Sequence, residues 1–147
     1  MLEPGRVMAL DVGDARTGVA VTDPMRIIAS PHGVVNMTSF EKGLAELKAL
    51  IAALAPVRIV VGLPLDRHGG IGPRAEKTLA FIERLRAEVS IEIVTQDERF
   101  STVEADRALR EGNVRGKKRK QTVDKIAATH ILNAYLDKLA ARERLAP

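Results

Sequence analysis

The order of the expected secondary structure elements indicates an α/β domain with a mixed sheet. Two short apolar segments joined by a brief polar turn open the chain, and this pattern is typical of an antiparallel hairpin. Further along, apolar strands alternate with helical patterns, which is the arrangement that produces parallel strands. The chain has 147 residues, 46% of them hydrophobic, and is therefore long enough to bury one core. We expect a single domain over residues 1–147 whose five-stranded sheet begins as an antiparallel meander and continues with parallel strands.

Each strand is predicted from a short apolar run bounded by turn residues. The five expected strands cover residues 6–12, 17–22, 32–37, 57–64 and 91–98. The first two are joined by the turn Gly13-Asp14-Ala15-Arg16, and the third follows Pro31. The loop between the fourth strand and the next helix is rich in glycine.

Four helices are predicted from periodicity and end signals. The first covers residues 41–54, where leucine and isoleucine recur at helical spacing on one face. The second runs from Pro73 to about Val89, because proline favours the first turn of a helix. A capping box, Ser101 with Glu104, opens the third helix, which ends at Gly112. The last helix is expected over approximately residues 122–141.

The positive charge of the chain is concentrated in one segment, residues 113–120. The chain has a net charge of +4 and the segment contributes +5, so the remainder carries −1. Its cations are Arg115, Lys117, Lys118, Arg119 and Lys120. A local excess of this kind favours a loop that binds a polyanion such as nucleic acid, the alternative being a merely solvated loop. The sequence has no cysteine, no secretory signal and no run of about 18 apolar residues, so we expect a cytoplasmic protein away from membranes.

Three carboxylates occupy positions that packing alone does not explain. Asp11 lies in the apolar run of the first strand, where an unpaired charge is costly. Asp124 falls at the middle of the apolar face of the last helix, between the positions of Ile131 and Tyr135. At the carboxyl end of the last strand, Asp97 and Glu98 point to opposite sides, and periodicity does not decide which of them faces a site.

Converging carboxylates repel one another unless a cation neutralises them. Ligands that are all oxygen, with no cysteine and no clustered histidine, suit Mg²⁺ or Mn²⁺ rather than zinc. A carboxylate-held divalent ion beside a basic segment is typical of phosphodiester hydrolysis. The residues therefore predict a metal-dependent nuclease with structured RNA or branched DNA as its partner, and they do not separate these two substrates.

Four motifs occur in order along nearly the whole chain. They are LDVGDARTGVAVTD (10–23), VVGLPL with GPRAEKT (60–65 and 72–78), DERFST (97–102) and VDKIAATHILNAYL (123–136). Together they resemble the YqgF/RuvX family of Holliday junction resolvases and nucleases that mature the precursor of 16S ribosomal RNA. The resemblance implies a ribonuclease H-like fold and a role in maturing the 5′ end of pre-16S rRNA, with ribosomal precursor particles as partners.

The resemblance also assigns roles to residues. It implies that Asp11, Glu98 and Asp124 are the catalytic and metal-binding residues, so that Glu98 is chosen over Asp97. It also implies that Arg16 and Thr102 lie near the substrate. Ser101 is equally well explained by its capping role. The loop Asp66–Gly72 departs from the family pattern, so no substrate contact is assigned to it.

Two other functions fit parts of the sequence. The first motif also looks like the phosphate hairpin of actin-like ATPases, but these enclose ATP between two such domains and the chain supplies one. A non-catalytic RNA-binding assembly factor would keep the fold and lose an acid, whereas all three acids are present. Aromatic residues are few, which argues against a protein that binds by stacking on bases.

Overall fold

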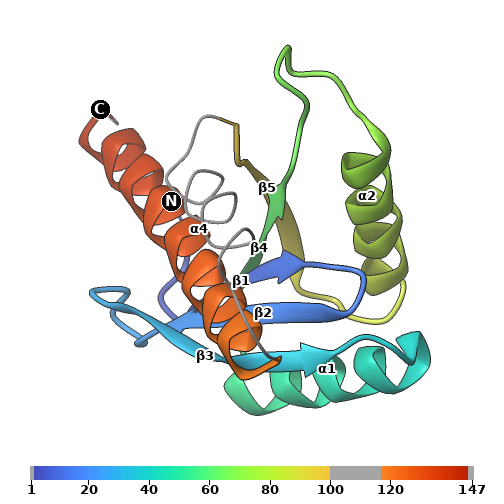
Figure 1. Ribbon diagram of the computed structural model, residues 1–147. Helices are drawn as coiled ribbons and strands as arrows, with labels where there is room; N and C mark the ends of the chain where they lie inside the picture. The colour runs from blue at the N-terminus through green and yellow to red at the C-terminus, as the bar shows by residue number, and fades with distance from the viewer. Residues whose placement is uncertain (1, 100–116, 146–147) are drawn as a thin grey trace.

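A five-stranded mixed sheet forms the centre of the computed structural model (Figure 1), which describes residues 2–99 and 117–145. Its strands lie in the order β3-β2-β1-β4-β5. They are β1 (Val7–Val12), β2 (Arg16–Thr22), β3 (Ala29–Asn36), β4 (Arg58–Leu63) and β5 (Glu92–Asp97). The first three strands pair antiparallel, and β4 pairs parallel with both β1 and β5. The predicted meander followed by parallel strands is confirmed.

The helices cover the two faces of the sheet separately. Helices α1 (Phe40–Leu54) and α2 (Pro73–Arg86) pack on one face, and the long helix α4 (Lys117–Leu145) crosses the other (Figure 1). Apolar side chains alternate along each strand between these two faces. In β1, Met8 and Leu10 face α1 and α2, whereas Val7 and Ala9 face α4.

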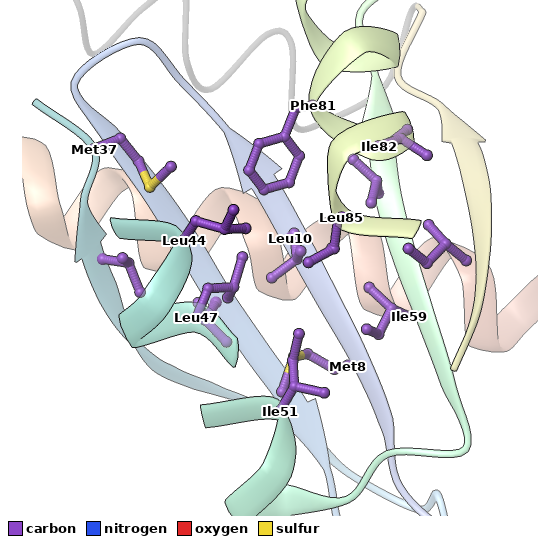
Figure 2. Close-up of a cluster of buried hydrophobic side chains, with 14 residues drawn as sticks. Met8, Leu10, Met37, Leu44, Leu47, Ile51, Ile59, Phe81, Ile82 and Leu85 are labelled. Carbon is purple, nitrogen blue, oxygen red and sulfur yellow. The ribbon is translucent and has the colours of Figure 1, made fainter. Parts of the chain in front are cut away.

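The larger hydrophobic cluster lies between the sheet and the first two helices. Figure 2 shows Leu44, Leu47 and Ile51 of α1 beside Ile82 and Leu85 of α2, above the side chains of β1 and β4. These α1 residues recur at the spacing predicted from the sequence, because that spacing places them on one side of the helix. The helix ends at Leu54, followed by Ala55 in the left-handed conformation and then by Pro56, which cannot continue it.

Strand β3 begins earlier than expected and includes Pro31. Proline lacks the N–H group that a central strand needs, so the sequence indicated a strand only after it. The structure resolves this by placing β3 at the edge of the sheet, with an irregularity opposite Val19 and Ala20. A proline is tolerated at an edge strand beside a bulge.

Helix α4 also begins earlier than expected, at Lys117. The prediction that residues 113–120 form a loop is therefore wrong for Lys117–Lys120, which continue the helix by one more turn. Lysine and arginine favour helix, so the basic composition does not oppose this extension. Residues 113–116, including Arg115, and the predicted helix 101–112 lie outside the described residues. Within the described part of the chain, no helix is both long and apolar enough to cross a lipid bilayer.

The connection between β2 and β3 is organised by Asp23 and Arg26. The Asp23 carboxylate accepts hydrogen bonds from the backbone N–H groups of Met25, Ile27 and Ile28, at 3.0, 2.9 and 2.7 Å. The bond from Ile28 is the largest cause that holds the pKa of Asp23 below its usual value of 3.8. Arg26 has a positive φ of 57° and donates to the carbonyls of Glu3 and Gly5.

We predict that Asp23→Ala lowers the stability of the protein near neutral pH and loses this effect in acid. A carboxyl group whose pKa is depressed in the folded state contributes stability above its unfolded pKa, and the contribution is lost as the pH falls through the folded value. Urea unfolding at pH 6 and at pH 3 would measure the difference between parent and variant. An equal difference at the two pH values would contradict the prediction.

Candidate active site

Asp11 lies on the face of the sheet that helix α4 covers, near the carboxyl ends of the parallel strands. It follows Val7 and Ala9 at alternate positions of β1 and therefore shares their face. Only 6% of Asp11 is exposed. Its neighbour on β2 is Gly18, and the parallel register that pairs Leu10 with Val61 brings Gly62 of β4 beside it on the other side. A buried carboxylate thus lies between two glycines.

Helix α4 touches the sheet directly at Gly18. A β-carbon at this position would lie 2.6 Å from the carbonyl carbon of Asp124 and still closer to its carbonyl oxygen. No side chain fits in that space, so the backbone of the helix rests on the backbone of β2. This contact brings Asp124 of the helix to strand β2, which is the neighbour of Asp11.

Glu98 lies over the second glycine. It follows β5 directly, and its N–H donates to the Leu63 carbonyl at 3.2 Å, which extends the pairing of β4 and β5. A β-carbon at Gly62 would lie 2.9 Å from the carboxyl carbon of Glu98 and 2.5 Å from the Ile131 Cδ1 atom. Glu98 is 5% exposed. The absence of a side chain at Gly62 therefore creates the space that the Glu98 carboxyl group occupies.

The Asp124 side chain pairs with Arg16. The Arg16 Nε atom donates to Asp124 Oδ2 at 2.6 Å, and about a fifth of each side chain is exposed, 24% and 20%. Arg16 starts β2 and its carbonyl accepts the N–H of Gly13, which closes the β1–β2 turn. The sequence placed Asp124 on the inward face of its helix, and the structure adds the cation that accompanies it there.

Asp97 points away from the acidic face and pairs with Arg99. The Arg99 guanidinium and N–H donate to its carboxylate at 2.8 to 3.0 Å. Partial burial raises the pKa of Asp97, but the bonds from Arg99 together lower it by more than burial raises it. The pKa of Asp97 therefore lies below its usual value. A β-carbon at Gly69 would lie 2.7 Å from Arg99, so the divergent loop packs on this arginine. The alternation argument and the preference for Glu98 are both consistent with this arrangement.

The structure thus gathers two buried acids and the start of α4 at one edge of the sheet, but it does not form a finished metal site. Among residues 2–99 and 117–145, no three acidic or histidine side chains form a group that could hold a metal ion in their present positions. Thr102 and Arg115 lie outside the described residues. The backbone of Lys117–Lys120 lies about 6 to 10 Å along the helix axis from Asp124, from the rise of 1.5 Å per residue.

Sequence reasoning overlooked the two glycines. Both interrupt apolar strands, in the segments TGVAV and VVGL. An isolated glycine within a strand indicates the close approach of another backbone or a ligand. Reading Gly18 and Gly62 in this way would have indicated a close approach to each of these two strands.

Comparisons with a family model and with similar sequences identify the same family. Residues 5–138 match the model of the RuvX family, described as Holliday junction resolvase. A relative from Clostridioides difficile is 44% identical over 90% of this chain and 94% of its own length, and one from Clostridium novyi is 42% identical over 91% and 99%. Both carry the name "Putative pre-16S rRNA nuclease".

Solved structures with low sequence identity share the fold. RuvC of Thermus thermophilus superimposes with a TM-score of 0.53 at 14% identity, over 92% of this chain and 96% of that chain. The Fowlpox virus resolvase in complex with Holliday junction DNA gives 0.57 at 9% identity, over 91% and 98%. The ribonuclease H-like fold that the sequence resemblance implied is confirmed.

We predict that Gly18→Ala destabilises the protein by about 2 kcal/mol or more, because the new methyl group forces α4 away from β2. Gly33→Ala is the matched control, since a β-carbon at Gly33 in edge strand β3 meets no atom within 4 Å. Urea unfolding of both variants measures the difference. Equal stabilities of the two variants would show that the helix does not rest on Gly18.

Proposed function

The chain belongs to the RuvX family, and from this membership we propose that it is a divalent-metal-dependent nuclease that cleaves the phosphodiester backbone of precursor 16S ribosomal RNA. One observation supports the proposal most strongly. Two buried carboxylates, Asp11 and Glu98, face the same side of the sheet at the carboxyl ends of parallel strands, and Glu98 occupies the space that Gly62 leaves open. Ligands bind at this edge in open α/β sheets.

The donor set fits Mg²⁺ or Mn²⁺. The candidate ligands are the carboxylates of Asp11, Glu98 and Asp124, which are the hard oxygen donors that these ions prefer. The ion pair with Arg16 engages Oδ2 of Asp124, and the carboxylate has a second oxygen with which to coordinate. When bound, a divalent ion would activate water and stabilise the negative charge that develops on the phosphate.

The remaining residues position the substrate in this proposal. Arg16 holds Asp124 beside Asp11 and adds a positive charge near the site. The basic residues Lys117–Lys120 begin the helix that carries Asp124, so phosphates bound there lie close to the acids. The N-terminal end of the helix adds its partial positive charge to theirs.

Pre-16S rRNA is proposed as the substrate because the relatives with 41 to 44% identity carry that name. Branched DNA is the second candidate, favoured by the family description and by the fold shared with junction resolvases. Cleavage of a pre-16S rRNA fragment and of a four-way DNA junction, assayed side by side with Mn²⁺ or Mg²⁺, separates the two. Cleavage of neither nucleic acid would overturn the proposed activity.

We predict that Asp11→Asn lowers the cleavage rate by about 100-fold or more while the protein stays folded. Losing a residue that merely supports a metal ligand already costs 10- to 100-fold, and a direct ligand costs at least as much. Asp137→Asn is the control, because Asp137 is an exposed acid on α4. EDTA should abolish the parent's activity in the same assay. Parental activity in Asp11→Asn would refute the role of this residue.

We predict that replacing Lys117, Lys118, Arg119 and Lys120 by alanine weakens binding to RNA and DNA alike. Alanine maintains the helix, so the change removes charge and not structure. Each lost phosphate contact should flatten the dependence of log K on log[salt] by about 0.7 to 0.9. Fluorescence anisotropy at several salt concentrations measures both quantities, and an unchanged slope would show that these residues do not contact phosphates.

A further inference from the structure

A groove of about 730 Å³ lies beyond the β1–β2 turn, on the side of the sheet away from α4. Its walls come from the turn itself, from the start of α1 and from one side of α2. The residues that matter here are Asp14, Phe40, Arg74, Lys77, Phe81 and Arg84. Figure 2 shows Phe81 at the end of the hydrophobic cluster where this turn lies. No residue of the proposed acidic set lines the groove.

Two phenylalanine rings form its apolar wall. The rings of Phe40 and Phe81 meet edge to face, with centroids 6.3 Å apart and planes at 88°. Phe81 is buried in the core, whereas Phe40 is 37% exposed. The Arg84 guanidinium lies 5.5 Å from the centre of the Phe40 ring and holds it from one side. The Phe40 ring is thus held by two neighbours while part of the residue stays exposed to solvent.

The groove has an excess of positive charge. Arg74, Lys77 and Arg84 line it together with one acid, Asp14. Arg84 also pairs with Glu41 at 3.0 Å, so Arg74 and Lys77 are the main cations of the groove. The contact between Lys77 and Asp14 is long, 3.4 Å, and both side chains are mostly exposed, so it neutralises little of this charge. Arg74 is exposed on the first turn of α2. Cations beside an exposed aromatic ring are the combination that binds single-stranded nucleic acids.

The groove also includes residues that follow Asp11 directly in the sequence. Val12 lines it from the end of β1 and Asp14 from the turn that follows, and Asp11 directly precedes Val12. Three residues span at most about 11 Å. We propose that the groove binds an unpaired nucleotide of the strand being processed, with its base stacked on Phe40 and its phosphates near Arg74 and Lys77. The proposal rests on the proposed nuclease function and adds a preference for single-stranded segments next to the cleavage point.

The test measures binding of a fluorescent single-stranded RNA of 12 nucleotides to the full chain, by anisotropy in EDTA so that no cleavage occurs. Phe40→Leu keeps an apolar side chain and removes the ring, and we expect it to bind about 5-fold or more weakly. An abasic strand keeps the phosphates and lacks bases, so parent and Phe40→Leu should bind it equally. Thermal melting checks that the variant is folded.

Arg74→Ala provides an independent second variant at an exposed position. It should weaken binding and flatten the salt dependence by about 0.7. Lys42→Ala removes the same charge from an exposed position on α1 outside the groove, and its binding should stay within 2-fold of the parent. Parental affinity in Phe40→Leu, equal binding by Arg74→Ala and Lys42→Ala, or failure of the parent to bind single strands would each overturn the subsite.

These results are separate from those that test catalysis. If the parent cleaves RNA and Phe40→Leu binds single strands as the parent does, the nuclease stands and the subsite falls. If Phe40→Leu weakens binding and the parent cleaves nothing, the subsite stands as a binding site and the proposed activity falls. Lys42→Ala, which lies outside the groove, should retain the parental cleavage rate.

Discussion

The contact between helix α4 and strand β2 at Gly18 determines how the acidic residues are arranged. Because Gly18 has no side chain, the helix backbone reaches the sheet at this point. Asp124 on the helix therefore lies at Gly18, the residue that pairs with Asp11. A larger residue would lift the helix by the thickness of a side chain. Gly62 acts in the same way on the other side of Asp11, where it leaves room for the Glu98 carboxyl group. Gly18 and Gly62 thus allow Asp124 and Glu98 to lie on either side of Asp11.

The ion pair between Arg16 and Asp124 orients these two side chains and adds little to the stability of the fold. Both side chains are partly exposed, and pairs of this kind contribute about 1 kcal/mol or less. Its bond, however, joins the hairpin to the helix across 108 positions of the chain. The hairpin is also held to the end of β3, because the N–H of Met37 donates to the Ala15 carbonyl at 2.8 Å. The turn after Asp11 is therefore fixed from two sides.

The sequence predicted the sheet because hydrophobic alternation and turn residues act locally. The positions of most elements, and the antiparallel meander followed by parallel strands, follow from such local rules, whereas the preference for Glu98 over Asp97 came from the family resemblance and not from periodicity. The edge position of β3 depends on which strand lies beyond it, and that information is not local, so Pro31 was read as a boundary. The start of α4 was missed for a similar reason, since charge argued for a loop while helix propensity at Lys117–Lys120 allowed a helix. The pairing of Arg16 with Asp124 joins distant segments and could not be derived from either segment alone.

The β1–β2 hairpin connects the two faces on which function is proposed. Along one strand, alternation sends Asp11 towards α4 and Val12 towards the groove. The few aromatic residues of the chain argued against base stacking, but stacking needs one ring that is exposed and held, and Phe40 meets both conditions. Composition counts rings and does not report where they lie. A nucleic acid strand that crosses this edge of the sheet would meet the cations and the Phe40 ring on one side of the hairpin and the carboxylates on the other. The proposed binding and the proposed cleavage are therefore assigned to different residues on the two sides of the hairpin.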